Sequence, residues 1–531
     1  MSIPPYLRNS GQRVRDFVQR HSQFVWFFLI LCLGIFARVW EIRFLPSGLH
    51  QDEASIGMDA YYLLKYGLDR NGFSYPVHLV AWGSGQNALY AYLLMPFLAL
   101  FGLKAVVIRL PNLILGILTL PVIYLIGKQI VDKKFGLFFM FCVAISPWHI
   151  LLSRWGLESN ILPFFFSVGF YCLLKSRDHL GWFIAANIFF AISLYAYGTA
   201  YAAIPIFFAF SIFIIIKFKW LSWKKLGAGF GILVLMGFPI FLFVIINLLK
   251  LETLHFGLVS IPRLPVLSRF EGLGAMFSGN SFLSTLRNYA LAFFNLLITQ
   301  DDLRSRNSLP PYGYFYPFAS QLSLAGIIFL FRSLNKNREQ KLFLLAWFLT
   351  SLILGMLQPV IINRINLIFI PIIFCAAYFI YWLHGHFQIA LPLAVIALLI
   401  GFSLFTRDYH GPIYRQDIDK EFYAGLVPAI DFARKSSGPI CVTNQKIYMP
   451  YIFVLFSEQT PPLEYLKQVT YVDPNEPLRE VRSMGRYTFG TQNCNPAPGL
   501  SYILFEKEKI PVNGEYKKKI FGNYIVYTPQ N

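Results

Sequence analysis

The sequence predicts a polytopic all-α membrane protein with about eleven spans and a small C-terminal α/β domain. Of 531 residues, 56% are hydrophobic and only 14% are charged, whereas soluble proteins carry roughly 25% charged residues. Phe occurs 54 times and Tyr 30 times. A water-soluble globule cannot bury so much apolar surface, so lipid must solvate most of the chain. The composition changes near residue 407, where Pro, Lys, Glu and Asp return.

The predicted spans are apolar runs that approach the roughly 20 residues a membrane-crossing helix needs. The first run lacks a convincing small-residue cleavage site, so we expect a retained span rather than a signal peptide. The runs lie near 24–44, 109–130, 135–151, 161–175, 181–197, 201–217, 226–249, 318–334, 342–357, 364–383 and 387–406.

The net charge of +19 reflects membrane topology rather than nucleic-acid binding, because the basic residues form short clusters between apolar runs. All clusters fall on the cytoplasmic side only if the short apolar stretch 86–102 does not cross the membrane. We therefore expect a surface helix there, at the outer leaflet. The clusters are Arg8, Arg13, Arg15 and Arg20; Lys128, Lys133 and Lys134; Lys175 and Arg177; Lys217, Lys219, Lys224 and Lys225; and Arg332, Lys336, Arg338 and Lys341.

This topology divides the chain into a cytoplasmic segment 1–23, a transmembrane domain 24–406 and an extracytoplasmic α/β domain 407–531. We expect the protein in the plasma membrane, with outward loops at 45–108 and 250–317. In the last domain, Ile418–Ser436 has a helical pattern, and strands are expected at Pro439–Thr443, Ser501–Glu506 and Ile520–Tyr527. Outside the cytoplasm Cys441 and Cys494 would be able to form a disulfide, although the sequence does not establish the pairing.

Two adjacent carboxylates, Asp52 and Glu53, open the first outward loop. Charge near the hydrocarbon boundary is costly and tends to be functional. The alternative is structural: Asp52 caps a helix that runs to about Tyr66, and Glu53 complements its dipole. The two roles are compatible, because a capping position holds a carboxylate rigidly, as a general base requires. His50 and Gln86, in the same loop, are candidate substrate-binding residues.

A second acidic site follows the third run, where Arg154 and Glu158 are either a helix-end ion pair or part of an outward-facing site. Arg364 opens the tenth run, where it either snorkels to the interface or binds a lipid phosphate. The polar loop from Asp301 to Tyr312 either shapes an acceptor site or is a solvated connection, and the second interpretation is slightly favoured. The sequence contains no Walker loop, dinucleotide fingerprint or Cys/His metal cluster, so nucleotide-driven transport finds no support.

These features resemble the GT-C class of polyprenyl-phosphate-sugar glycosyltransferases. The relevant residues are the Asp-Glu of the first outer loop, the surface helix, Arg109-Leu110-Pro111 at the start of the second span and Ser153-Arg154 after the third. The nearest families would be protein O-mannosyltransferases, aminoarabinose transferases and lipopolysaccharide galacturonosyltransferases. The resemblance covers roughly residues 24–175 by motif and the remainder by layout.

The resemblance implies roles for individual residues. Asp52 matches the proposed catalytic acid and Glu53 its neighbour, while Arg109 and Arg154 match substrate-binding arginines. The sequence departs from the family in three places. Ser55 and Ile56 follow Ala54 where many relatives have an Arg, Gly85-Gln86-Asn87 replaces Lys-Pro-Pro, and Glu158 stands four residues after Arg154 where many relatives have Asp five after.

The expected activity is inverting transfer of a sugar from a polyprenyl phosphate to an acceptor hydroxyl on the outer face, with Asp52 as general base. Arg154, Arg364 or a divalent metal would stabilise the leaving phosphate, and Asp52 and Glu158 are the candidate metal ligands. The partners would be the lipid-linked donor, a glycolipid, glycan or protein acceptor, and the bilayer. The rival classes are a transporter or flippase of lipid-linked glycans, which would show inverted repeats and mid-bilayer charges, and a non-catalytic membrane scaffold.

Overall fold

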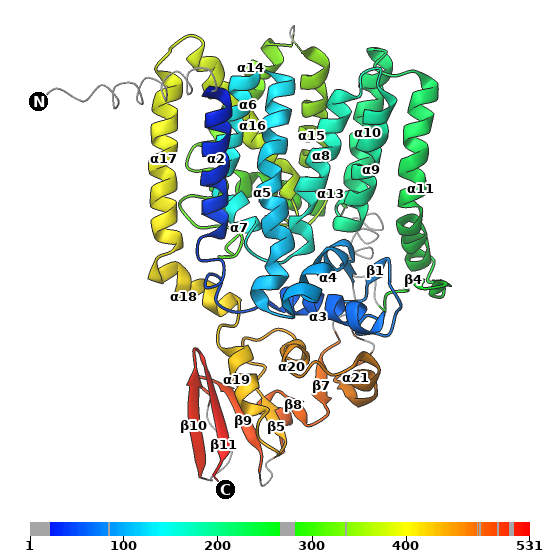
Figure 1. Cartoon of the computed structure of the whole chain (residues 1–531), viewed down its shortest axis with the longest axis vertical. Helices are drawn as coiled ribbons and strands as arrows, with labels where there is room; N and C mark the ends of the chain where they lie inside the picture. Colours follow the sequence, from blue (N-terminus) through cyan, green and yellow to red (C-terminus); the bar gives the residue numbers. More distant parts are fainter. Residues whose placement is uncertain are drawn as a thin grey trace, which may run out of the picture.

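Long apolar helices form a bundle, and a sheet-containing C-terminal region lies beyond one end of it (Figure 1). The computed structural model describes residues 22–82, 85–265, 282–334, 337–474, 476, 479–495, 499–508 and 515–530. Arg8, Arg13, Arg15, Arg20 and Lys336, which entered the topology prediction, lie outside these residues. We call the end of the bundle nearest the C-terminal region the lower end.

Each predicted apolar run contains a helix of the bundle. Seven helices among the described residues are long and apolar enough to cross a bilayer, which makes this a multi-pass membrane protein; the total of about eleven spans stays a prediction. The bundle helices are α2 (Ser22–Val39), α5 (Ala105–Ile130), α6 (Lys133–Ala144), α8 (Leu162–Lys175), α9 (Leu180–Ala196), α10 (Ala200–Lys217), α11 (Trp223–Leu248), α14 (Ala319–Arg332), α15 (Arg338–Met356), α16 (Phe369–His384) and α17 (Ala390–Tyr409).

The two ends of the bundle carry different connections. The links α5–α6, α8–α9, α10–α11 and α14–α15, which contain the basic clusters of the sequence, lie at the upper end (Figure 1). Irregular segments lie at the lower end, and they include the short elements α7 (Pro147–Leu152), η1 (Glu158–Asn160) and η2 (Asn366–Ile368). The described residues of the basic clusters used in the topology prediction therefore lie at the end opposite these connections.

The first lower connection holds two helices below the bundle, α3 (Gln51–Tyr66) and α4 (Leu89–Phe101) (Figure 1). Between them, β1 (His78–Leu79) pairs antiparallel with β2 (Gln86–Asn87), and this hairpin carries Trp82. A second hairpin, β3 (Leu254–Phe256) and β4 (Val259–Ile261), follows α11.

One helix of the described membrane part has no counterpart among the predicted elements. The segment expected to be loop 250–317 contains α13 (Phe282–Thr299), which packs against α15. Its apolar residues recur at helical spacing with polar residues between them, so its hydropathy stays below that of a span.

The C-terminal region contains a seven-stranded mixed sheet in the order β10-β11-β9-β5-β8-β7-β6, in which β5 runs parallel to both neighbours. This agrees with the predicted fold class. The elements are α18 (Pro412–Glu421), α19 (Leu426–Ala433), β5 (Ile440–Val442), α20 (Tyr451–Glu458), α21 (Pro462–Gln468), β6 (Val469–Tyr471), β7 (Val481–Met484), β8 (Tyr487–Phe489), η3 (Thr491–Asn493), β9 (Ser501–Phe505), β10 (Tyr516–Phe521) and β11 (Tyr524–Pro529).

Two predicted elements of this region are wrong in detail. The single helix 418–436 is split into α18 and α19, because Gly425 adopts φ 91° and a side chain there would meet the carbonyl oxygen of Phe521. The predicted strand 520–527 instead contains the end of β10, the turn at 522–523 and the first part of β11.

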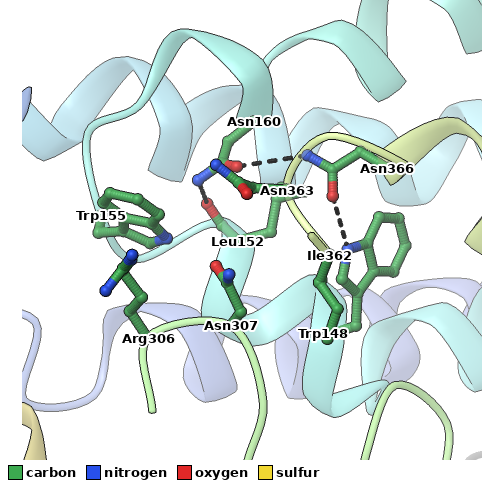
Figure 2. A pocket seen from close by; sticks show the side chains of 9 residues that line it. All are labelled: Trp148, Leu152, Trp155, Asn160, Arg306, Asn307, Ile362, Asn363 and Asn366. Carbon is green, nitrogen blue, oxygen red and sulfur yellow. Dashed lines mark hydrogen bonds between the residues drawn. The ribbon is translucent and has the colours of Figure 1, made fainter. Parts of the chain in front are cut away.

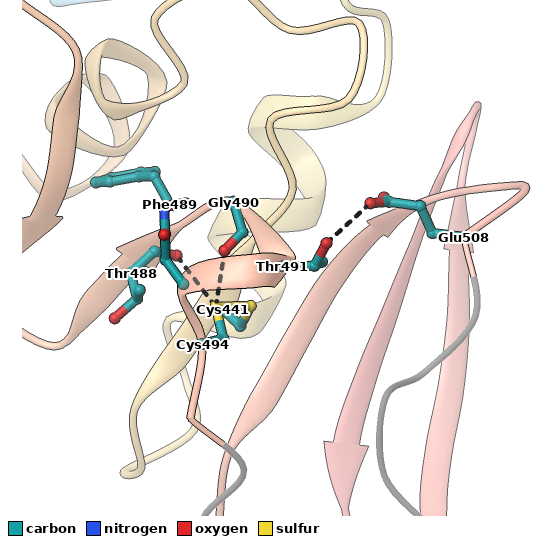
Figure 3. Close-up of a disulfide and its surroundings, with 8 residues drawn as sticks. Cys441, Thr488, Phe489, Gly490, Thr491, Cys494 and Glu508 are labelled. Atoms are coloured by element: carbon teal, nitrogen blue, oxygen red, sulfur yellow. Dashed lines mark hydrogen bonds between the residues drawn. A yellow bond between two sulfur atoms is a disulfide. The ribbon is translucent and has the colours of Figure 1, made fainter. Parts of the chain in front are cut away.

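A disulfide joins Cys441 of β5 to Cys494, just after η3 (Figure 3). The bond closes a loop across the middle of the sheet, and Cys494 also lies against the carbonyl oxygens of Thr488 and Gly490. The pairing that the sequence left open is therefore present.

Candidate active site

The N-terminus of α3 is fixed by a capping box. The His50 side chain accepts from the backbone N–H of Asp52, and the Glu53 carboxylate accepts from the backbone N–H of His50 at 3.1 Å. The cap is therefore His50, and the alternative in which Asp52 caps the helix is wrong, although the helix ends at Tyr66 as predicted. The Asp52 side chain is left to make other contacts.

Asp52 points its carboxylate toward the first-loop hairpin. Its Oδ1 accepts a hydrogen bond from Nε1 of Trp82 at 3.1 Å, and its Oδ2 lies 3.5 Å from Nδ1 of His50. Burial, reinforced by the charges of Arg306 and Arg109, lowers the pKa of His50 well below its usual value, so the imidazole is neutral. The Asp52 side chain is 27% exposed and so remains accessible to a ligand.

Glu53 is instead fully buried, and its carboxylate accepts four hydrogen bonds. Two come from Arg109, at 2.8 and 2.9 Å, in the forked geometry of a bidentate ion pair; the others come from the backbone N–H groups of His50 and Gly156. The remaining Arg109 donors reach the carbonyls of Pro46 and Gly48. Within the described part of the chain both side chains are held by protein groups, an environment typical of a positioning role.

Arg154 is likewise buried within the protein. Its guanidinium donates to the carbonyl oxygens of Arg38, Trp40 and Leu45 and lies 5.2 Å from the centre of the Tyr409 ring. These contacts fasten the chain that leaves α2, and they involve carbonyl oxygens rather than the carboxylate of Glu158.

Glu158 and Gln86 belong to one buried hydrogen-bonded chain. Gln86 donates to Glu158 at 3.1 Å and accepts from the hydroxyl of Ser55, which in turn accepts from Arg70 at 2.7 Å. Glu158 is 3% exposed. The structure thus brings Gln86 and Glu158 together on the Asp52 side of the bundle, with Ser55 of α3 linking the two loops.

Arg70 connects this chain to the Trp82–Asp52 pair. Its guanidinium lies 5.0 Å from the centre of the Trp82 ring and 3.6 Å from the buried carboxylate of Asp59. Sequence analysis missed Arg70, Asp59, Ser55 and Trp82. A signal was present for two of them, because Asp52, Ser55 and Asp59 have the i, i+3, i+7 spacing of one helix face.

Arg364 has a different environment from the other arginines. Its backbone carbonyl accepts from Thr199 and Gln358, whereas its half-buried guanidinium has no partner among the described residues. Its segment is held by Asp302, whose carboxylate accepts from the backbone N–H of Ile362 at 3.0 Å. Of the two predicted phosphate ligands, Arg154 and Arg364, only Arg364 has a guanidinium without a hydrogen-bond or ion-pair partner among the described residues.

The loop from Asp301 is more than a solvated connection. Besides the Asp302 contact, Arg306 forms a 2.7 Å ion pair with Glu421 of the C-terminal region and lies 6.0 Å from the centre of the Trp155 ring. A small cavity lies between these loops, where Asn366 accepts from the Trp148 indole and donates to Asn160 (Figure 2). The loop thus joins three outer connections around one polar pocket.

Comparison with known proteins supports the resemblance noted in the sequence. Residues 28–255 match the family described as dolichyl-phosphate-mannose-protein mannosyltransferase. No curated protein shows significant sequence similarity to the chain. ArnT from Cupriavidus metallidurans, in a crystal structure with bound undecaprenyl phosphate, superposes with a TM-score of 0.58 at 12% identity, over 96% of this chain and 98% of that protein. The chain therefore has the same fold as ArnT.

A second solved structure with this fold is of a larger protein. The oligosaccharyltransferase AglB from Archaeoglobus fulgidus, in complex with an inhibitory peptide and a dolichol-phosphate, superposes with a TM-score of 0.51 at 13% identity. The match covers 83% of this chain but only 64% of AglB, so the chain spans less than two thirds of that enzyme's length. At these identities the structural matches establish the fold.

The expected divalent metal has a counterpart in another AglB structure, which is a complex with Zn and sulfate. In the part of this chain that the structure describes, no group of three or more His, Cys, Asp or Glu side chains is placed to hold an ion. Asp52 contacts Trp82 and His50, and Glu158 contacts Gln86.

Proposed function

We propose that the protein transfers a sugar from a polyprenyl phosphate to an acceptor hydroxyl at the lower end of the bundle. The family match and the GT-C fold support this reaction class. The bound dolichol-phosphate of AglB and undecaprenyl phosphate of ArnT support the donor class. The reaction breaks the bond between the anomeric carbon and the phosphate oxygen, and it forms a glycosidic bond to the acceptor oxygen.

In this proposal Asp52 is the general base, and the exposure of its side chain supports the assignment. Of the four carboxylates Asp52, Glu53, Asp59 and Glu158, only Asp52 is appreciably exposed; the others are at most 3% exposed. A base must reach the proton that it abstracts, so only Asp52 can contact an acceptor hydroxyl directly. Attack from the face opposite the lipid phosphate inverts the anomeric centre, and the hydroxyl proton passes to the Asp52 carboxylate.

The surrounding residues would hold this base in place. Trp82 donates to Oδ1 of Asp52, and the Glu53–Arg109 pair fixes the helix turn from which Asp52 projects. A base whose orientation is set before binding loses less free energy in reaching the transition state. We assign Glu53, Arg109 and the Gln86–Glu158 pair as positioning residues.

The leaving group is a lipid phosphate, whose charge must be stabilised as it departs. The unpartnered guanidinium of Arg364 has the forked donors that match phosphate oxygens. We therefore propose that Arg364 supplies this charge.

We further propose that the lower end faces away from the cytoplasm. The Cys441–Cys494 disulfide is typical of oxidising compartments, and the basic connections lie at the opposite end. Nucleotide sugars are cytoplasmic, so a site on the outer side requires a donor carried by the membrane itself.

The test is a transfer assay with purified protein, mannosyl, glucosyl and aminoarabinosyl polyprenyl phosphates, and a mixture of glycan, glycolipid and Ser/Thr-peptide acceptors, in EDTA. We expect release of polyprenyl phosphate together with glycosylated product, and loss of both in Asp52→Asn. Asn retains the shape of the side chain but cannot accept the proton. An Asp52→Asn variant that folds and keeps full activity would remove Asp52 from the role, and donor translocation without release would favour a flippase.

A further inference from the structure

An aromatic cluster lies where the first-loop hairpin meets the C-terminal region. We call it the aromatic seam: Trp82, Tyr423, Tyr448 and Tyr451. The Trp82 ring lies 6.3 Å from that of Tyr448 and 6.2 Å from that of Tyr451, both edge-on, and the Tyr423 hydroxyl accepts from the backbone N–H of Tyr448. Tyr448 is 38% exposed, so the seam is open to solvent rather than a closed core.

The backbone that presents these rings is strained. Trp82 and Tyr423 adopt φ values of 50° and 47°, and Lys446 and Met449, on either side of Tyr448, adopt 56° and 52°. Bulky L-residues rarely adopt this left-handed conformation, and such strain persists where a ligand or a reaction needs it.

The seam adjoins the proposed base. The Trp82 indole donates directly to Asp52. Burial raises the pKa of Tyr448 to about 12, and the negative charge of Asp52 is the next largest cause. Burial and the charge of Asp52 also raise the pKa of Tyr423. Both tyrosines therefore lie within electrostatic range of Asp52.

We propose that the aromatic seam binds a pyranose ring of a glycan acceptor and presents one of its hydroxyls to Asp52. This inference rests on the proposed function and names its acceptor class. A pyranose ring has an apolar C–H face that packs on aromatic rings, and equatorial hydroxyls that suit the polar tips of tyrosines. The loop before Tyr448 also exposes the carboxamides of Asn444 and Gln445, which are hydrogen-bonding groups for hydroxyls.

The experiment is a calorimetric titration of the full-length protein in detergent with cellotetraose, chitotetraose and α-mannotriose. We expect at least one oligosaccharide to bind. Tyr448→Ala should weaken that binding roughly tenfold or more, and Tyr448→Phe, which keeps the ring, should retain most of it. Tyr66→Ala is the matched control, because Tyr66 is an exposed tyrosine of α3 outside the seam. Thermal unfolding of each variant verifies that it is folded.

The outcomes separate this inference from the proposed function. If none of the three oligosaccharides binds, or if Tyr448→Ala and Tyr66→Ala bind equally well, the seam is not a glycan site. A Ser/Thr-rich peptide that binds in a Tyr448-dependent manner would also overturn it. Because the titration measures binding, Tyr448-dependent glycan binding by a protein that releases no polyprenyl phosphate would support the seam and contradict only the transferase.

Discussion

The Trp82 indole N–H donates to Oδ1 of Asp52 at 3.1 Å, joining the first-loop hairpin to the N-terminal turn of α3. This contact fixes one oxygen of the proposed base and leaves the side chain 27% exposed. Trp82 also belongs to the aromatic seam. In the proposed mechanism this one residue therefore both orients the Asp52 carboxylate and helps to place the acceptor.

Trp82→Phe separates these two roles, because Phe keeps an aromatic ring but has no donor. A hydrogen bond to a charged group contributes about 1.5–3 kcal/mol, so we expect kcat to fall roughly ten- to a hundredfold. The acceptor KM should change little. Steady-state kinetics with varied acceptor checks this, and a raised KM at normal kcat would contradict the positioning role.

Glu53→Gln tests the buried ion pair with Arg109. The substitution leaves the guanidinium buried beside a neutral partner, and breaking such a pair costs about 3–5 kcal/mol. We expect a clear fall in the thermal unfolding midpoint. Asp417→Asn is the matched control, because it breaks the exposed Asp417–Lys420 pair, which contributes at most about 1 kcal/mol. Equal midpoints for the two variants would argue against the role of Glu53.

Arg364→Ala tests the proposed phosphate ligand. We expect the Kd for undecaprenyl phosphate to rise roughly tenfold or more, because a charge-assisted contact is lost, and Arg364→Lys to recover part of the affinity. Arg43→Ala serves as control, since Arg43 is exposed just after α2 and contacts only the Phe44 ring. Unchanged binding in Arg364→Ala would place the phosphate elsewhere.

Asp69→Asn tests a pH dependence of stability. Burial raises the pKa of Asp69 to about 7, so the folded protein binds a proton that the unfolded chain releases near pH 4. Stability should therefore fall as pH rises from about 4 to 7, because the native state binds more protons there. The variant should lose this slope and unfold at a higher temperature than the wild type at pH 8. If the thermal midpoints of the variant and the wild type change with pH in parallel, Asp69 does not cause the pH dependence.

The sequence predicted the membrane helices because spanning segments must be apolar over their whole length. It also located Asp52, since a carboxylate at the membrane boundary is conspicuous. It could not distinguish Asp52 from Glu53. That difference depends on Arg109, which lies 56 residues away, and on a backbone N–H from Gly156. The sequence also could not show which arginines are buried. Arg109 and Arg154 are buried inside the protein, whereas Arg364 is not.

Other omissions had visible signals. The break between α18 and α19 falls at Gly425, a residue typical of a left-handed turn. The helix α13 was not predicted because it is amphipathic, and amphipathic segments do not reach the hydropathy of a membrane span. Trp82 offered no such signal, because its importance comes from the strained hairpin that turns it toward Asp52.

Phe422 lies between the two parts of the protein. Its ring is 5.5 Å from both the His50 ring and the Arg109 guanidinium, and its carbonyl oxygen occupies the space that a side chain at Gly48 would need. A truncation after α17 would thus expose the cap of α3 and disturb the residues around Asp52. The sheet-bearing region therefore cannot be exchanged between relatives as an independent specificity module unless a glycine is kept at position 48.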